Sequence, residues 1–113
     1  MHLEPETEVA DRRRATRLEV RAGVCATVFD AMTGRSWPSA IRDISLTGIA
    51  LLMEQTFAVG QLLGVELRHA ESNRVRNYLV EVRHSDICCP NDSYLHGCRF
   101  VEPLSDAEWR LWL

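Results

Sequence analysis

The chain of 113 residues contains no lysine, so each of its 13 basic residues is an arginine. Sixteen acidic residues outnumber them and give a net charge of -3, which argues against a general attraction to nucleic acid or anionic membranes. No stretch approaches the roughly 18 consecutive apolar residues of a membrane-spanning helix, and the first residues form no apolar secretory segment. We therefore expect a cytoplasmic protein with no membrane span.

Aromatic residues make up only 7% of the chain, and there are four cysteines. The aromatics are not interleaved with basic residues as on a platform that stacks bases, so no nucleic-acid partner is predicted. The cysteines form no CxxC pair and the histidines have no ligand spacing, so no metal is predicted. Cys25 and Cys98 fall inside apolar segments and are predicted to lie in the core. Because no nucleophile is paired with a base, we expect no enzyme.

Hydrophobic residues make up 46% of the chain, which suffices for one domain with its own core. Residues 1–11 are polar and acidic and contain a proline, so they are predicted to form a flexible arm before a domain over residues 12–113. Six segments of the domain alternate between apolar and polar residues, which is the period of a β-strand. These segments cover residues 18–31, 36–43, 48–54, 62–70, 75–84 and 93–101, and residues 86–92 are predicted to be a loop.

Further details of the pattern complete the predicted fold. Pro38 suggests that the second strand is an exposed edge or carries a bulge. His84 is in phase with the valines before it and is predicted to point inward. Ser105 and Glu108 form a capping box that begins a short C-terminal helix. The pattern predicts an all-β fold, a small antiparallel barrel of six strands followed by that helix.

Two polar segments stand apart from the strand pattern. The first, RRRATR at residues 12–17, places four arginines within six positions. The guanidinium group clamps phosphate through two hydrogen bonds and stacks on flat rings, so this segment is a candidate anion site. The second, DISLTG at residues 43–48, has the chemistry of a turn, in which glycine accepts a positive φ. The alternative interpretation is that the arginines are solvated charges and that Asp43 and Ser45 only satisfy their own turn.

Together these segments read R-x-x-x-R at Arg13 and Arg17 and then D-x-S-x-x-G at Asp43, Ser45 and Gly48. This order resembles the signature of PilZ domains, the bacterial receptors for cyclic di-GMP, a second messenger. The sequence HGCRF near the C-terminus is similar to the G-x-x-F ending of the last PilZ strand. The resemblance implies a six-stranded PilZ-type barrel, no catalysis, and a nucleotide bound between the N-terminal arm and the D-x-S-x-x-G turn.

The chemistry of cyclic di-GMP agrees with these residues. Its two phosphates and two guanine edges need forked cations, which Arg13 and Arg17 supply. Asp43 can accept from the N1–H and N2–H groups of guanine, and the Ser45 hydroxyl can complete the contacts. Gly48 lets the backbone approach the ligand closely. Three further arginines could face the site but are more often solvated strand residues: Arg42, Arg83 and Arg99.

Arg12 directly precedes the first arginine of the motif. In PilZ domains a basic residue there accompanies an intercalated ligand dimer, so the resemblance implies two bound molecules. His84 matches a position where relatives place a ring against a guanine face, and a histidine that closes the barrel end is the alternative. We expect ligand binding to order the arm and so signal to a downstream protein partner. The competing hypothesis is a PilZ-like adaptor that binds a protein and has weak or no affinity for nucleotide.

Overall fold

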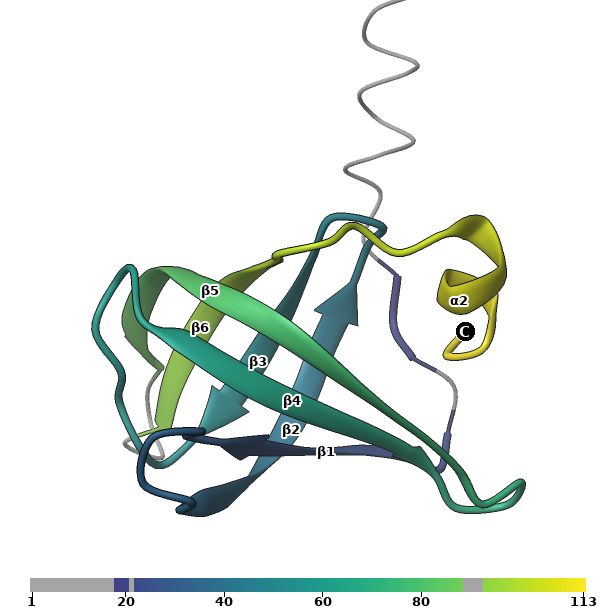
Figure 1. The fold of residues 1–113 in the computed structure, drawn as a ribbon, viewed down its shortest axis with the longest axis horizontal. Coiled ribbons are helices and arrows are strands. Elements are labelled where there is room, and N and C mark those ends of the chain that lie inside the picture. Colours follow the sequence, from purple (N-terminus) through teal and green to yellow (C-terminus); the bar gives the residue numbers. More distant parts are fainter. Residues whose placement is uncertain (1–17, 21, 89–92) are drawn as a thin grey trace, which may run out of the picture.

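The computed structural model describes residues 18–20, 22–88 and 93–113. This part of the chain forms six strands and one short helix: β1 (Val24–Phe29), β2 (Ser36–Ile44), β3 (Gly48–Met53), β4 (Leu62–His69), β5 (Arg74–Cys88), β6 (Ser93–Phe100) and α2 (Asp106–Arg110). The strands close into an antiparallel barrel in the order β1-β2-β3-β6-β5-β4 (Figure 1). The predicted six-stranded barrel with a C-terminal helix is confirmed.

Alternating side chains of the strands fill the interior of the barrel. Val28, Val65, Val82 and Phe100 are fully or almost fully buried, and each belongs to a different strand. Residues on either side of them in the sequence point outward, because successive side chains of a strand alternate between its two faces. The outer face therefore carries the polar residues of the same strands and is where a surface site can form.

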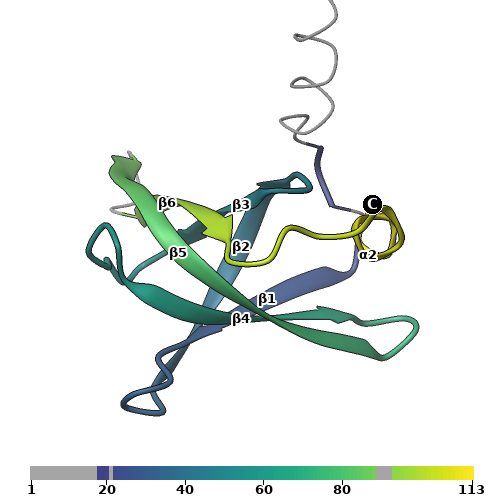
Figure 2. The same ribbon diagram turned by 45° about the horizontal axis from the view of Figure 1, so that its top comes forward.

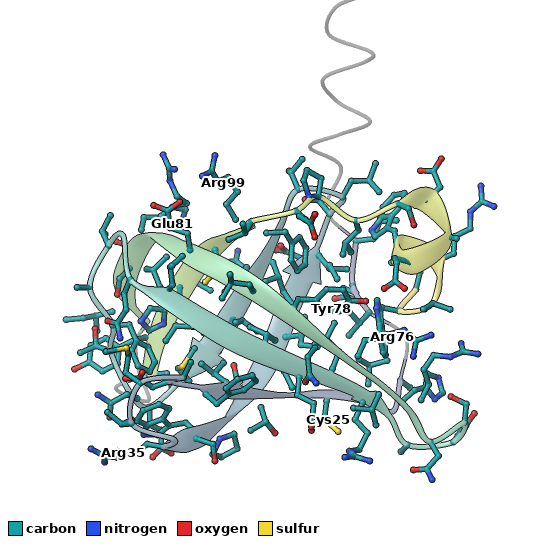
Figure 3. The ribbon with its side chains drawn as sticks, viewed as in Figure 1. Cys25, Arg35, Arg76, Tyr78, Glu81 and Arg99 are labelled. Carbon is teal, nitrogen blue, oxygen red and sulfur yellow. The ribbon has the colours of Figure 1, made fainter. Side chains whose placement is uncertain are left out.

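The C-terminal helix packs against one end of the barrel (Figure 2). The Ser105 hydroxyl accepts a hydrogen bond from the Glu108 amide at 3.1 Å, as the predicted capping box requires. The side chain of Trp112 is fully buried and its Nε1–H donates to the Tyr78 hydroxyl at 3.0 Å. Tyr78 in turn donates to the Glu108 carboxylate. These contacts fix the helix beside β5, where Figure 3 shows Tyr78 and Arg76.

Burial of Tyr78 and its hydrogen bond to Glu108 raise the pKa of this phenol. The phenol therefore stays protonated and can donate to the carboxylate at any physiological pH.

In the described ranges no helix is long and apolar enough to cross a membrane.

The first predicted strand, residues 18–31, is wrong in its first half. β1 begins only at Val24, after Gly23 with a φ of 91°. Leu18 instead pairs with Ile44 of β2, and their two backbone hydrogen bonds are both 3.0 Å long. The strand is interrupted at Gly23, whose positive φ turns the chain, while its carbonyl still accepts from the amide of Ala70 next to the end of β4. The predicted arm, residues 1–11, lies outside the described residues.

The prediction for Cys25 is wrong, whereas that for Cys98 is confirmed. Cys98 is buried in β6, but Cys25 is exposed. The inward positions of β1 are Ala26 and Val28, so Cys25 faces solvent by alternation. Among the described residues, no group of three or more histidine, cysteine, aspartate or glutamate side chains could hold a metal ion.

Two further expectations differ from the structure in their details. β2 is not an edge strand, because Pro38 lies opposite Thr27 of β1 in the closed barrel. A bulge does occur in β2, but after Ile41 and not at the proline. The predicted loop at residues 86–92 begins too early, since β5 continues to Cys88, which is paired with Ser93.

Candidate functional site

Two β-bulges lie in strands that flank the same outer surface of the barrel. The register of β2 with β3 shifts between Ile41 and Asp43, and that of β5 with β6 shifts between Val82 and His84. A bulge adds one residue to a strand and re-aims the side chains around it. The polar pairs that reach the surface at these bulges are Arg42 with Asp43 on β2 and Arg83 with His84 on β5.

One row of residues crosses the four strands between these bulges. Asp43 of β2 pairs with Ala50 of β3, and Ala50 pairs with Gly97 of β6. Gly97 pairs in turn with His84 of β5. Because the two middle residues are small, the polar ends of the row border a shallow groove of about 200 Å³. The groove is lined by Arg42, Asp43, Ala50, His84, Leu95 and Gly97.

The prediction that His84 points inward is wrong. His84 is exposed, because the bulge breaks the alternation that places Val82 in the core. Its imidazole ring lies over Gly97, in the space that a Cβ at that position would occupy. The absence of a side chain at Gly97 thus lets a flat ring lie on the strand at the border of the groove.

Asp43 stands at the opposite end of the row. Its side chain is half-buried, and its carboxylate lies 3.9 Å from Nε of the neighbouring Arg42. Directly after it, Ile44 is fully buried and anchors the end of β2 in the core. The carboxylate is therefore held on a rigid strand end and presents an acceptor to the groove, which suits recognition of N–H donors.

Ser45 begins the turn that joins β2 to β3 and is fully buried. Its hydroxyl accepts from the amides of Gly48 at 3.0 Å and Thr47 at 3.2 Å, and lies 3.3 Å from the Gly48 carbonyl. The Ser45 amide also donates to that carbonyl at 2.8 Å. These bonds make Ser45 a structural element of the turn, which was one of the two interpretations of its role.

Gly48 is buried at the start of β3. The described glycines with positive φ are Gly23, Gly34 and Gly60, so the expectation of a positive φ at Gly48 is wrong. Its extended backbone continues directly into the ladder, where it pairs with Arg99 of β6.

The described chain enters this region at Leu18. The Leu18 backbone is paired with Ile44, the residue between Asp43 and Ser45. Arg17 immediately precedes Leu18 in the sequence, but Arg12, Arg13 and Arg17 all lie outside the described residues. The described structure therefore places Asp43 and His84 on the groove and Ser45 and Gly48 in the adjoining turn, with Leu18 paired beside them.

The sequence patterns missed the groove floor, although they named Arg42, Arg83 and Arg99 as residues that could face the site. Ala50 and Gly97 carry no functional group, so their place in the site can be recognised only from the residues with which they pair across the strands. Two consecutive polar residues inside a strand, as at positions 42–43 and 83–84, were the available signal for the bulges, since they interrupt strict alternation. Arg99 lies two residues beyond Gly97 on β6 and pairs with Glu81 of β5. Nη2 of Arg99 is 2.9 Å from Oε1 of Glu81.

These features define a class of protein: a small closed antiparallel barrel with a shallow polar groove on its outer face, next to a D-x-S-x-x-G turn. The family model described as PilZ domain matches residues 11–111. The chain belongs to the PilZ domain family.

Solved structures of other proteins share this fold. The complex of MrkH from K. pneumoniae with c-di-GMP superposes with a TM-score of 0.64 at 21% identity, covering 84% of this chain and 46% of that one. The PilZ domain of YcgR from Escherichia coli with c-di-GMP gives 0.59 at 15% identity, covering 85% and 82%. The Bacillus subtilis inhibitor of motility MotI gives 0.62 at 15% identity, covering 86% and 46%.

This chain spans a little under half of the MrkH and MotI chains to which it is similar. No curated protein sequence matches it.

Proposed function

We propose that this PilZ domain is a receptor for cyclic di-GMP and that the nucleotide binds over the groove between Asp43 and His84. The observation that carries this proposal is the cross-strand row, which joins the D-x-S-x-x-G turn to a flat imidazole ring across a floor of small residues. A carboxylate suits the N1–H and N2–H edge of guanine, and a ring suits its face. The MrkH and YcgR structures with c-di-GMP support the choice of ligand.

In this proposal Arg13 and Arg17 bind the phosphates. The assignment rests on the sequence motif, because both arginines lie outside the described residues. It is supported by the pairing of Leu18 with Ile44, since Arg17 is covalently joined to Leu18 and thus to a residue at the border of the site. Two forked cations suit two phosphates, each through a pair of charge-assisted hydrogen bonds.

Ser45 and Gly48 contribute to the same site through the turn. The Ser45 hydroxyl holds the Gly48 and Thr47 amides, and so fixes the backbone that follows Asp43. We propose that Gly48 lets the nucleotide approach this backbone. Arg12 adds a third guanidinium beside the motif, and we propose that it supports binding of two intercalated molecules of cyclic di-GMP.

The signal in this proposal passes through the segment that precedes Leu18. Contacts from Arg13 and Arg17 to the nucleotide would fix this segment against the barrel and create a surface for a downstream protein partner. No catalytic step is involved, because binding itself changes the surface.

A protein-interaction adaptor with weak or no nucleotide binding is the second candidate. It is favoured by a larger groove of about 510 Å³ on the outer face of β2 and β3, whose lining includes Trp37, Pro38, Ala40 and Leu52. The lining also includes polar residues such as Glu54 and Gln55, and a groove of this mixed character can accept a protein side chain. The engagement of the Ser45 hydroxyl within its own turn is also compatible with this alternative.

Isothermal titration calorimetry with cyclic di-GMP separates the two candidates. We expect micromolar or tighter binding, with two molecules bound per chain. Arg13→Ala and Arg17→Ala should each weaken binding roughly 10- to 150-fold, since each removes a charge-assisted contact set of about 1.5–3 kcal/mol. Arg110→Ala is the matched control, because Arg110 is exposed on α2 and should bind as the parent does. A parent chain that binds no cyclic di-GMP would favour the adaptor instead.

A further inference from the structure

A single carboxylate oxygen on β5 is shared between two arginines. Oε1 of Glu81 lies 2.9 Å from Nη2 of Arg99 on β6 and 3.7 Å from Nη1 of Arg83 on its own strand. Both arginine side chains are more than half exposed, at 57% and 53%, whereas Glu81 is at 26%. Figure 3 shows Arg99 and Glu81 projecting together from the same side of the barrel.

This cluster adjoins the groove of the proposed nucleotide site. Arg99 pairs with Gly48 of β3 on one side and with Glu81 of β5 on the other. It is two residues from Gly97, and the intervening Cys98 points into the core. Arg99 and Gly97 therefore share the outer face of β6, so Arg99 stands one step along the strand from the groove floor.

The fold does not depend on the Arg99–Glu81 ion pair. β5 and β6 are joined by a continuous antiparallel ladder on both sides of the bulge, and solvent-exposed ion pairs contribute little to stability. A guanidinium group binds a phosphate through the same forked geometry that it uses for a carboxylate. Arg99 can therefore exchange one anionic partner for the other without any change in the strands.

We propose that Arg99 is a further nucleotide-binding residue, which Glu81 holds beside the groove and which moves to a phosphate of the bound cyclic dinucleotide. This inference rests on the proposed function. Glu81 keeps the guanidinium oriented in the free protein and competes with the ligand for it. The affinity for the nucleotide is therefore lower than it would be if Arg99 had no competing carboxylate beside it.

Calorimetric titration of cyclic di-GMP at fixed ionic strength tests this exchange. We expect Arg99→Ala to weaken binding about tenfold, the effect of losing a charge-assisted hydrogen bond. Glu81→Gln should tighten binding about two- to fivefold, because it removes the competing partner in an exposed pair. In the Glu81→Gln/Arg99→Ala double variant the tightening should disappear, whereas it should persist in Glu81→Gln/Arg83→Ala, because Arg99 is the nearer partner of the Glu81 carboxylate.

A second exposed pair provides the matched control. Nη2 of Arg68 lies 3.6 Å from Oε1 of Glu66 on β4, a strand that does not border the groove. Glu66→Gln and Arg68→Ala change the same charges at a distance, so both should bind as the parent does. Thermal unfolding of each variant checks that the barrel is intact.

The outcomes distinguish this inference from the function on which it rests. If the parent binds cyclic di-GMP and Arg99→Ala binds equally well, Arg99 does not contact the nucleotide and only the exchange is refuted. If Glu81→Gln tightens binding as much without Arg99 as with it, the exchange is refuted, and the effect comes from Arg83 or from the loss of a charge that repels the anionic ligand. A parent that binds no cyclic di-GMP overturns the proposed function and the exchange together.

Discussion

The imidazole ring of His84 lies over Gly97 on the neighbouring strand, in the space that a Cβ at Gly97 would fill. This arrangement follows from the β5 bulge, which turns His84 outward and sets it opposite the glycine. A glycine in a strand is intrinsically unfavourable, and an aromatic ring from the adjacent strand covers the exposed backbone. The outer surface consequently gains a flat ring whose position depends on a missing side chain.

Gly97→Ala should displace the His84 ring and weaken cyclic di-GMP binding several-fold, with the unfolding free energy within about 1 kcal/mol of the parent. The displaced group is the exposed end of a side chain, so the barrel can adjust at little cost. Gly64→Ala is the control: the Phe29 ring lies over Gly64 in the same way, but on β1 and β4. It should leave binding unchanged. Titration calorimetry measures the affinity of both variants for cyclic di-GMP. If Gly97→Ala binds as tightly as Gly64→Ala, the His84 ring has no role in binding.

Replacing Asp43 should affect the ligand more than the fold. The carboxylate is half-buried at the groove border, whereas Ile44 and Ser45 beside it are fully buried and anchor the strand end in the core. Asp43→Ala should therefore weaken cyclic di-GMP binding about tenfold, while the free energy of unfolding changes by less than about 1 kcal/mol. Titration calorimetry and urea unfolding measure the two quantities. Parallel losses in both would indicate that Asp43 mainly supports the turn.

Ser45 should behave in the opposite way. Its buried hydroxyl accepts from two backbone amides, those of Thr47 and Gly48, and removal leaves both without this partner. Ser45→Ala should lower the free energy of unfolding by about 1–3 kcal/mol, the cost of buried donors that lose an acceptor. Urea unfolding checks this, with Ser39→Ala as a control at a less buried serine of β2. A stability equal to that of the parent would show that water replaces the hydroxyl.

The contrast between Asp43, Ser45 and His84 shows what the sequence could predict. The alternation of apolar and polar residues was sufficient to predict six strands, because each strand buries one face in the same core. The D-x-S-x-x-G segment was placed correctly because its residues are adjacent in sequence and their turn chemistry is local. The orientation of His84 was not predictable in this way. It depends on a bulge that arises between β5 and β6, and on a glycine 13 positions further along the chain.

Cys25 illustrates a second limit. Free cysteine is usually buried, and this general preference suggested a core position. The alternation of β1 puts Cys25 on the face of the strand that does not carry Val24 and Val28. This local pattern was the better guide, since Cys25 is exposed. For Cys25, the position in the strand period therefore outweighs the average tendency of cysteine to be buried.

Acid should destabilise the barrel through His96. Its side chain is fully buried, and Nε2 accepts a hydrogen bond from the Phe57 amide at 3.1 Å, which requires the neutral ring. Burial lowers the pKa of His96 below the usual value of about 6.5. Between that usual value and the lowered pKa, the unfolded chain binds more protons than the folded one. Stability is therefore fully present above about pH 6.5 and falls as the pH decreases below it.

Urea unfolding at pH 7.5 and 5.5, for the parent and for His96→Gln, checks this pH dependence. Glutamine can still accept from the Phe57 amide but does not titrate. The parent should lose more unfolding free energy than the variant between the two pH values, by at most about 1.4 kcal/mol, because only one pH unit of this interval lies below the usual pKa of about 6.5. The same loss in both proteins would assign the acid sensitivity to other groups.

Hydrogen exchange over residues 8–20 tests how the proposed signal leaves the site. If Arg13 and Arg17 bind the phosphates, each backbone residue fixed with them costs roughly 1–2 kcal/mol of conformational entropy, which the nucleotide contacts must exceed. Amide exchange in this segment should therefore slow when cyclic di-GMP is added.

The Leu18 amide is an internal reference for this experiment, because it already donates to the Ile44 carbonyl at 3.0 Å without ligand. The Arg13→Ala chain should show a smaller effect at the same ligand concentration. Exchange that is equally slow with and without nucleotide would mean that binding leaves this segment unchanged, and the partner surface would then have to lie on the barrel itself.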